Sequence, residues 1–213
     1  MTEAGCPDFA TLARREPEGR AWQRELAGRR SAILIAAPHG GGIERGTTEI
    51  ARALAGSELS FYSLLGMKLR GNEELHISSH RFDDPAFLDL AAGARVVVAL
   101  HGCRDAPRMV YLGGRHAALR LRVAAALEAA EFPVSRDDPR NPGEDPRNLC
   151  NRGRDSRGVQ LELSRGLRQA MFAGLSAPER RHTTPLFGTF VGALRPVLLE
   201  AERQMGGGAA PPA

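Results

Sequence analysis

The fold is decided by the stretch AILIAAPHGGGIERGTTEIARAL, residues 32–54. Its first six residues are all apolar and include two isoleucines, which is typical of a strand covered on both faces in a parallel or mixed sheet. The strand is expected to end at Pro38 in a glycine-rich loop, after which Thr47 and Thr48 offer an N-cap for an amphipathic helix over residues 49–54. The stretch therefore predicts a central strand, a loop and a helix in succession.

The rest of the chain repeats this alternation of strands and helices. A short helix is expected at residues 9–15, and residues 22–26 are expected to form a β-hairpin with residues 32–37. Further strands are expected at residues 59–64, 95–100, 109–112 and 159–163, and further helices at residues 115–131 and 189–204, the last interrupted by Pro196. The alternation predicts an α/β fold with a mixed, mostly parallel central sheet flanked by helices.

Length and composition fit one globular domain. The 213 residues are 42% hydrophobic and 25% charged, so the chain can enclose a core. We expect a single domain over residues 1–205 and a disordered Gly/Pro/Ala tail over residues 206–213. No apolar run reaches the roughly 18–20 residues of a membrane span, and no apolar signal core opens the chain. The sequence therefore predicts a soluble, cytoplasmic protein without a membrane partner, and we expect a monomer.

The charge balance is modestly basic, with 29 basic and 25 acidic residues. Lys68 is the one lysine, so nearly all of the basic charge is arginine, whose fork of N–H donors binds carboxylates and phosphates. This composition is compatible with an anionic substrate. Aromatic residues make up 5% of the chain and do not alternate with basic residues, which disfavours nucleic acid as a partner.

Two histidines directly follow predicted strands. His39 follows AILIAAP and His101 follows VVVAL, and α/β sheets bind ligands at the carboxyl ends of their strands. Glu44 can turn back toward His39, because three glycines lie between them. Two histidines and a glutamate are a common ligand set of catalytic zinc, with a fourth position left for water. The three cysteines include no CxxC pair that would hold zinc through sulfur.

Each of these residues also has an ordinary structural interpretation. A histidine at a strand end is more often a hydrogen-bonding loop residue, and a glutamate near a helix start more often complements the helix dipole. The sequence HGGG also occurs in the oxyanion holes of esterases, but the chain contains no GxSxG nucleophile elbow. Gly40, Gly42 and Gly46 miss the GxGxxG spacing by one residue, so nucleotide binding has weak support.

Glu162 is the candidate general base. It lies in GVQLELS (residues 158–164), where strict alternation places Gln160, Glu162 and Ser164 on one face of a strand. A glutamate on a strand can simply face solvent. Hydrolysis at zinc, however, needs a carboxylate that accepts a proton from water and returns it to the leaving amine. The polar loop over residues 137–157 is of the length and composition that often carries functional residues.

Six segments between about residues 37 and 168 form a combined pattern: APHGGGIERGTTEIARAL, ELHISSHRFDDP, VVVALHGC, VYLGGRHAALR, NLCNRG and GVQLELSRGLR. They resemble the zinc-dependent poly-γ-glutamate hydrolases of phages and bacteria, a family similar in fold to zinc carboxypeptidases. The resemblance implies zinc on His39, Glu44 and His101, with Glu162 as general base. It also implies a hydrolase that cleaves the γ-glutamyl amide bonds of poly-γ-glutamate.

The pattern departs from that of zinc carboxypeptidases. The four residues between His39 and Glu44 make a wider spacing than those enzymes have, and the Asn-Arg pair that precedes their third ligand follows it here. Arg152 or Arg165 is a candidate for binding the α-carboxylate that a γ-linked glutamate leaves free. Arg152 can equally pin the long loop as a structural residue. His80 is a further candidate for a substrate contact, with a solvated loop histidine as the ordinary alternative.

Two other functions stay open at this level. A metal-dependent deacylase of small N-acyl amino acids, in the style of N-formylglutamate amidohydrolases, would use the same ligands in a closed pocket. A noncatalytic anion-binding protein would bind anions through its basic residues but would not hydrolyse a substrate. The expected partner is thus an anionic polypeptide or a small γ-glutamyl compound, and family resemblance alone does not choose between them.

Overall fold

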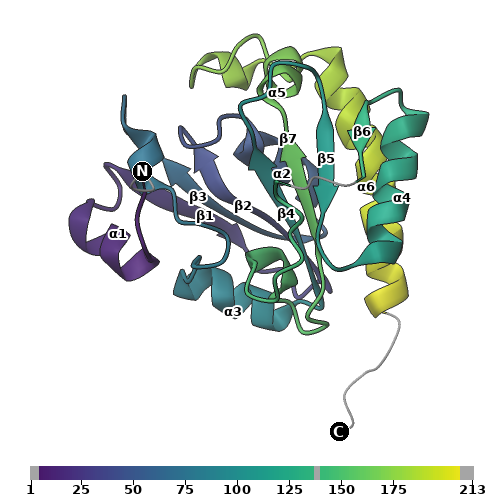
Figure 1. The fold of residues 1–213 in the computed structure, drawn as a ribbon, viewed down its shortest axis with the longest axis horizontal. Helices are drawn as coiled ribbons and strands as arrows, with labels where there is room; N and C mark the ends of the chain where they lie inside the picture. The colour runs from purple at the N-terminus through teal and green to yellow at the C-terminus, as the bar shows by residue number, and fades with distance from the viewer. Residues whose placement is uncertain (1–4, 137–139, 207–213) are drawn as a thin grey trace, which may run out of the picture.

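The described part of the chain folds around one seven-stranded sheet with helices on both faces (Figure 1). The computed structural model describes residues 5–136 and 140–206. The strands are β1 (Trp22–Ala27), β2 (Ile33–Gly41), β3 (Ser60–Gly66), β4 (Val96–Gly102), β5 (Val110–Gly113), β6 (Val134–Ser135) and β7 (Val159–Leu163). The helices are α1 (Phe9–Arg15), α2 (Thr47–Ala55), α3 (Pro85–Gly93), α4 (Ala117–Ala129), α5 (Arg165–Met171) and α6 (Pro185–Gly206). The predicted α/β fold is confirmed.

The sheet is mixed and mostly parallel, with the strand order β1-β3-β2-β4-β7-β5-β6. Only the β1–β3 and β5–β7 pairs within this sheet of described residues are antiparallel. The strands β2 and β4, whose predicted ends are followed by the two histidines, are central neighbours. The chain leaves β2 toward β3 on one side and leaves β4 toward β5 on the other. A topological switch point therefore lies between them, and α/β proteins bind ligands at such points.

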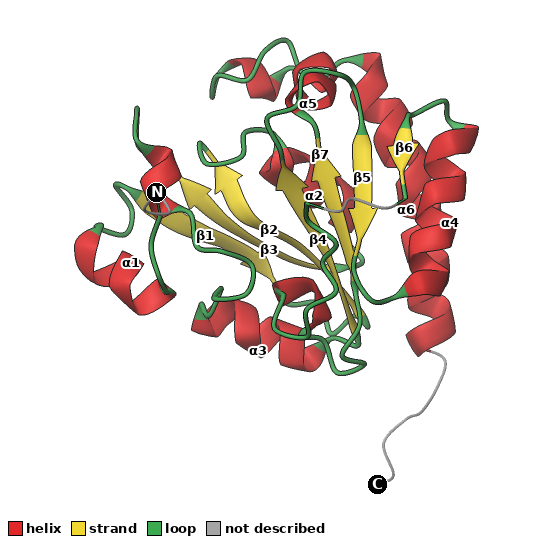
Figure 2. Ribbon diagram, viewed as in Figure 1, coloured by secondary structure: helices red, strands yellow, loops and turns green. Residues whose placement is uncertain are grey.

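Each face of the sheet buries its own apolar cluster, because side chains alternate along the strands. On β2, Ile33 and Ile35 face the cluster that is covered by α2, α4, α5 and α6. Leu34 and Ala36 face the cluster that is covered by α1, α3 and neighbouring loops. Figure 2 shows α1 and α3 away from α4 and α6, with the strands between them. The result is a three-layer arrangement that leaves the carboxyl ends of the central strands accessible.

The predicted hairpin between residues 22–26 and residues 32–37 is wrong. Strand β1 pairs antiparallel with β3 instead, with Trp22 opposite Gly66. Every residue of β2 is buried, so both of its edges need partners, and these are the parallel strands β3 and β4. The partly exposed β1 suits the edge of the sheet.

Three boundary predictions also needed correction. Strand β2 does not end at Pro38 but continues to Gly41. Gly46 occupies the N-cap of α2, while the Thr47 hydroxyl donates to the carbonyl oxygen of Glu44 and the Thr48 hydroxyl accepts from the backbone N–H of Gly41. Pro196 does not interrupt α6, which runs from Pro185 to Gly206.

The continuation of α6 through a proline follows from its packing. Pro196 is itself exposed, but the buried stripe continues on both sides of it with Phe190, Leu194 and Leu198. An internal proline costs a helix about 3 kcal/mol, whereas each buried Leu or Phe contributes about 1.5–3 kcal/mol. Burial of the stripe therefore outweighs the lost hydrogen bond.

Some elements were not predicted at all, and some predictions fall outside the described residues. Helices α3 and α5 and the two-residue strand β6 are additions to the predicted set. The tail predicted over residues 206–213 lies outside the described residues except for Gly206, which ends α6. The described part of the predicted loop over residues 137–157 holds a short 3-10 turn, Leu149–Asn151. None of the helices in residues 5–136 and 140–206 has the length and apolar character that crossing a membrane requires.

Asp84 ties the sheet to the loop that precedes α3. Its Oδ2 accepts hydrogen bonds from Tyr62 Oη at 2.5 Å and from Arg24 Nε at 2.8 Å. Its Oδ1 accepts from the backbone N–H of Ala86 and caps α3. Burial, followed by the charge of Asp84, raises the pKa of Tyr62 well above its ordinary value. The loop over residues 76–84 is therefore fixed to the sheet at its end.

We expect Tyr62→Phe to lower the free energy of unfolding by about 2 kcal/mol, because it removes a buried hydrogen bond to a charged group. Tyr111→Phe is the matched control, since the hydroxyl of Tyr111 bonds to the partly exposed Asp105. Its expected loss is below about 1 kcal/mol. Urea unfolding followed by circular dichroism measures both. Equal losses in the two variants would contradict the anchoring role of Asp84.

Candidate metal centre

A bulge at the end of β2 turns His39 onto the face of the sheet that holds His101. The register of β2 against β3 shifts between Ala37 and Gly40, so that β2 carries one extra residue. Strict alternation would place His39 on the same face as Ala37, and the extra residue reverses this. The His39 ring accordingly packs against Phe82, a member of the apolar cluster on the other face, with ring centroids 6.2 Å apart.

The glycines after His39 allow the chain to reverse within a few residues. Gly41 has a φ of 61°, in the left-handed region that favours glycine. A Cβ at Gly40 would lie 2.1 Å from Oγ1 of Thr48, so no larger side chain fits there. The backbone N–H of Glu44 then donates to the carbonyl oxygen of His39 at 2.8 Å. This loop returns the Glu44 side chain to the histidine.

Ligand-type atoms of His39, Glu44 and His101 converge at the switch point, all within 4.8 Å of one another. His39 Nδ1 lies 3.0 Å from Glu44 Oε1 and 3.2 Å from His101 Nδ1. His101 Nδ1 lies 3.6 Å from Glu44 Oε2, which also accepts a hydrogen bond from the backbone N–H of Gly102. Both histidines are buried. The structure thus brings together the three residues that the sequence singled out.

The hydrogen-bonding environment of Nε2 in the two imidazole rings determines which ring nitrogen offers a lone pair toward the centre of the cluster. His39 Nε2 lies 2.7 Å from the carbonyl oxygen of Ile77, which can only accept, so Nε2 donates and, when the ring is neutral, Nδ1 carries the lone pair. His101 Nε2 lies 3.4 Å from Ser79 Oγ. A lone pair and a carboxylate oxygen that face each other repel unless a cation lies between them. The arrangement is therefore suited to holding a metal ion.

The neighbouring charges shift the pKa values of the cluster. Burial favours the neutral form of Glu44, but when the histidines are protonated the His39 charge and hydrogen bonds from both histidines outweigh burial and hold the pKa of Glu44 far below its usual range. Burial alone would lower the pKa of His101, yet its hydrogen bond to Glu44 and the charge of Glu162 raise it. The charge of His39, together with burial, lowers the pKa of His76 to about 3. The site thus keeps an ionised carboxylate inside a buried environment.

The cluster opens into a cavity of about 590 Å³. Glu162 lines this cavity, opposite His101 in the β4–β7 pairing and opposite Tyr111 in the β5–β7 pairing. Its carboxylate is not part of the converging ligand atoms, although its charge reaches His101. Other polar residues of the wall include His76, His80, Arg104, Arg140, Glu144, Asp145 and Gln160.

The two arginines predicted to bind substrate do not line this cavity. Arg152 donates to the backbone carbonyl oxygens of Phe82, His80 and Arg147 at 2.6, 3.0 and 3.0 Å, so the geometry favours the loop-pinning alternative. Arg165 is exposed at the start of α5. His80 does line the cavity, as expected for a residue that contacts substrate.

Sequence reasoning missed the buried Arg168, which ties together the loops that follow the central strands. Its guanidinium group donates to the carbonyl oxygens of Arg45, Cys103 and Leu163 at 2.6, 2.7 and 3.1 Å. These acceptors lie after β2, after β4 and at the end of β7. Burial lowers the pKa of Arg168. Its place on α5, directly after the GVQLELS segment, was the available signal.

A family model described as poly-gamma-glutamate hydrolase matches residues 7–193. The chain belongs to this family. Two Bacillus subtilis proteins are similar to the chain over most of its length. YndL is 35% identical over 72% of this chain and 61% of its own length, and YmaC is 32% identical over 79% of this chain and 72% of its own. The chain thus spans less than two thirds of YndL. The family predicted from the sequence is confirmed.

Solved structures of the poly-gamma-glutamate hydrolase family agree with this assignment. A bacteriophage poly-gamma-glutamate hydrolase superposes with a TM-score of 0.89 and 28% identity, covering 92% of this chain and 97% of that one. Zinc-free YndL superposes with a TM-score of 0.87 and 30% identity, covering 92% and 98%. An N-formylglutamate amidohydrolase from Ralstonia eutropha, at 13% identity and a TM-score of 0.54, shares the fold.

We expect His39→Ala, Glu44→Ala and His101→Ala each to abolish stoichiometric binding of Zn²⁺, because two remaining ligands hold the ion poorly. His182→Ala is the matched control, since His182 is exposed and does not line the cavity. Metal content after dialysis, measured by mass spectrometry on folded protein, reports the result. A variant that keeps about one zinc per chain would remove its residue from the ligand set.

Proposed function

We propose that this protein is a zinc-dependent hydrolase that cleaves the γ-glutamyl amide bonds of poly-γ-glutamate. The observation that carries the proposal is the convergence of His39, Glu44 and His101 beside a cavity whose wall also holds Glu162. Membership of the poly-gamma-glutamate hydrolase family and the likeness to the bacteriophage enzyme support it. Because the chain spans only 61% of the length of YndL, the cleavage of poly-γ-glutamate by this protein is proposed and is not taken over from the relative.

Zinc is the metal that fits the donor set best. Two imidazole nitrogens and one carboxylate oxygen are ligands that catalytic zinc takes in hydrolases, with the fourth position open. Tetrahedral zinc with bonds of about 2.0–2.2 Å requires its ligand atoms to lie roughly 3.3 Å apart. The separations here are 3.0 and 3.2 Å from His39 Nδ1 and 3.6 Å between His101 and Glu44. The two Glu44 distances are to different carboxylate oxygens, Oε1 and Oε2, so the donor atoms lie near the separation that zinc requires.

The proposed reaction divides the chemistry between the ligands and Glu162. Zinc at this site would lower the pKa of water toward about 7 and polarise the scissile carbonyl group. Glu162 accepts the proton of the attacking water and then donates it to the leaving amine, which the cleavage of an amide bond requires. Its place beside His101 in the sheet register, outside the converging ligand atoms, suits a base that does not bind the metal.

Recognition of the substrate's carboxylates falls to arginines of the cavity wall. Arg140 bonds to Asp105 and stacks on the ring of Tyr111 at 4.8 Å, so its charge is already compensated. Arg104 is exposed, and its guanidinium group forms no hydrogen bond or ion pair within the described residues. We therefore assign to Arg104 the binding of the α-carboxylate nearest to the cleaved bond, in place of Arg152 and Arg165.

Substrate assays decide between the polymer and a small compound. We expect the zinc-loaded protein to shorten poly-γ-glutamate and to leave α-linked polyglutamate intact, because only the γ-linkage leaves an α-carboxylate free on every residue. Release of formate from N-formylglutamate without cleavage of the polymer would favour the deacylase alternative instead. The cytoplasmic location and the monomeric state stay predictions.

We expect Glu162→Gln to keep zinc and the fold, because the amide is nearly isosteric, and to lower turnover of poly-γ-glutamate by at least about 10²-fold. Glu144→Gln is the matched control, since Glu144 also lines the cavity but is exposed on the long loop. Rates are measured by product chromatography alongside metal analysis. Zinc loss in the Glu162 variant would make this residue a ligand, and near-normal turnover would exclude it as the base.

A further inference from the structure

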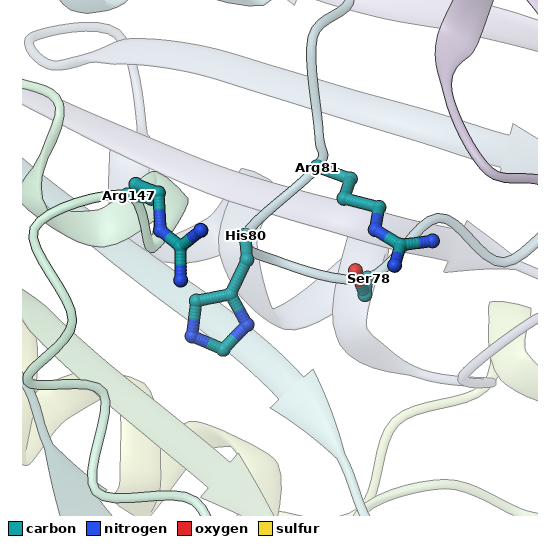
Figure 3. Close-up of a pocket in the computed structure, with 4 residues that line it drawn as sticks. All are labelled: Ser78, His80, Arg81 and Arg147. Atoms are coloured by element: carbon teal, nitrogen blue, oxygen red, sulfur yellow. The ribbon is translucent and has the colours of Figure 1, made fainter.

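A second, smaller pocket adjoins the cavity of the candidate metal centre. It has a volume of about 250 Å³ and is lined by Ser78, His80, Arg81 and Arg147. In the view of Figure 3, the His80 imidazole lies between the side chains of Arg147 and Arg81. Ser78 and His80 also line the larger cavity, so the two spaces adjoin at the loop that precedes α3.

The small pocket carries positive charge that its own residues do not fully compensate. The exposed Arg147 donates to the carboxylate of Asp145 at 2.8 and 3.2 Å, and His80 Nε2 lies 3.8 Å from the same group. Hydrogen bonds from Arg147 hold the pKa of Asp145 far below its usual range, so Asp145 stays ionised. Arg81 is exposed, and its guanidinium group has no hydrogen bond or ion pair in the parts of the chain that the structure describes. Arg81 is thus available to bind an external anion.

The backbone of the pocket is fixed, although the side chains of His80, Arg81 and Arg147 are exposed. The guanidinium group of Arg152 joins the carbonyl oxygens of His80 and Phe82 to that of Arg147. The backbone N–H of Leu149 donates to the carbonyl oxygen of Ser79 at 2.9 Å, which adds a second link between the same two loops. The two segments that line the pocket are therefore held together by hydrogen bonds to their backbone groups. These bonds fix the position of the pocket relative to the candidate metal centre.

We propose that this pocket is a carboxylate subsite, which binds the free α-carboxylate of a glutamate that neighbours the cleaved one along a γ-linked chain. The inference rests on the proposed function and names the feature that selects a polymer. An arginine fork matches the two oxygens of a carboxylate, and Ser78 and His80 supply further hydrogen-bonding groups. A small N-acyl amino acid occupies only the larger cavity, whereas an oligomer with a carboxylate on each residue reaches both spaces.

The test is the binding of a fluorescently labelled γ-linked glutamate oligomer to the full-length protein, treated with a chelator to prevent cleavage and followed by fluorescence anisotropy. We expect Arg81→Gln to weaken binding about tenfold, as the loss of one charge-assisted contact does. Arg203→Gln is the control with the same change of charge, because Arg203 lies on α6, away from both pockets. Its affinity should equal that of the wild type.

Two further comparisons tie the effect to the carboxylates. Asp145→Asn should tighten binding, since it releases Arg147 from its ionic partner. An oligomer with methyl-esterified carboxylates should bind the wild type and Arg81→Gln equally, because the group that Arg81 recognises has been neutralised. Persistence of the tenfold difference with the ester would contradict carboxylate binding.

The subsite and the proposed function fail in different ways. Equal affinity of the wild type and Arg81→Gln for the free-acid oligomer overturns the subsite, and cleavage of poly-γ-glutamate by the zinc-loaded wild type would still uphold the function. If the wild type neither binds the oligomer nor cleaves the polymer, both are overturned.

Discussion

The register shift in β2 is the constraint on which the site depends. Without the extra residue between Ala37 and Gly40, alternation would point His39 into the apolar core under α2, away from His101. With it, the imidazole reaches the carbonyl oxygen of Ile77, which fixes the ring with Nδ1 toward Glu44. One local irregularity in an otherwise regular parallel strand thus brings His39 together with Glu44 and His101.

Two arginines hold the loops around this centre, and both act through backbone carbonyl groups. Arg168 links the ends of the three central strands from within the fold. Arg152 links the loop before α3 to the long loop before β7. Because five fixed donors can satisfy several carbonyl oxygens at once, a single arginine replaces hydrogen bonds that irregular segments cannot make among themselves. These interactions give the loops the rigidity that strands obtain from pairing.

The sequence was informative wherever the relevant signal is local. Apolar runs followed by His39 and His101 identified the strand ends, and the alternation around Glu162 identified its polar face. The hairpin failed because the partner of β1 is chosen by the burial of β2, which only the complete sheet decides. Arg81 and Arg147 were overlooked because they are distant in sequence and line one pocket only as a result of the long-range contacts of the fold. Arg152 was found by its motif, but its hydrogen bonds could not be inferred from the motif.

Strand β7 enters the sheet between β4 and β5, which are consecutive in the chain. The three converging ligand residues all lie on β2, β4 and the loop between β2 and α2, within the first half of the chain, whereas Glu162 arrives only when β7 has inserted. Pairing of such distant segments requires closure of a long loop and is a slow event in folding. The ligand-type side chains and Glu162 therefore belong to two distant parts of the chain, and the pairing of β7 with β4 is what brings Glu162 to the cavity beside His101.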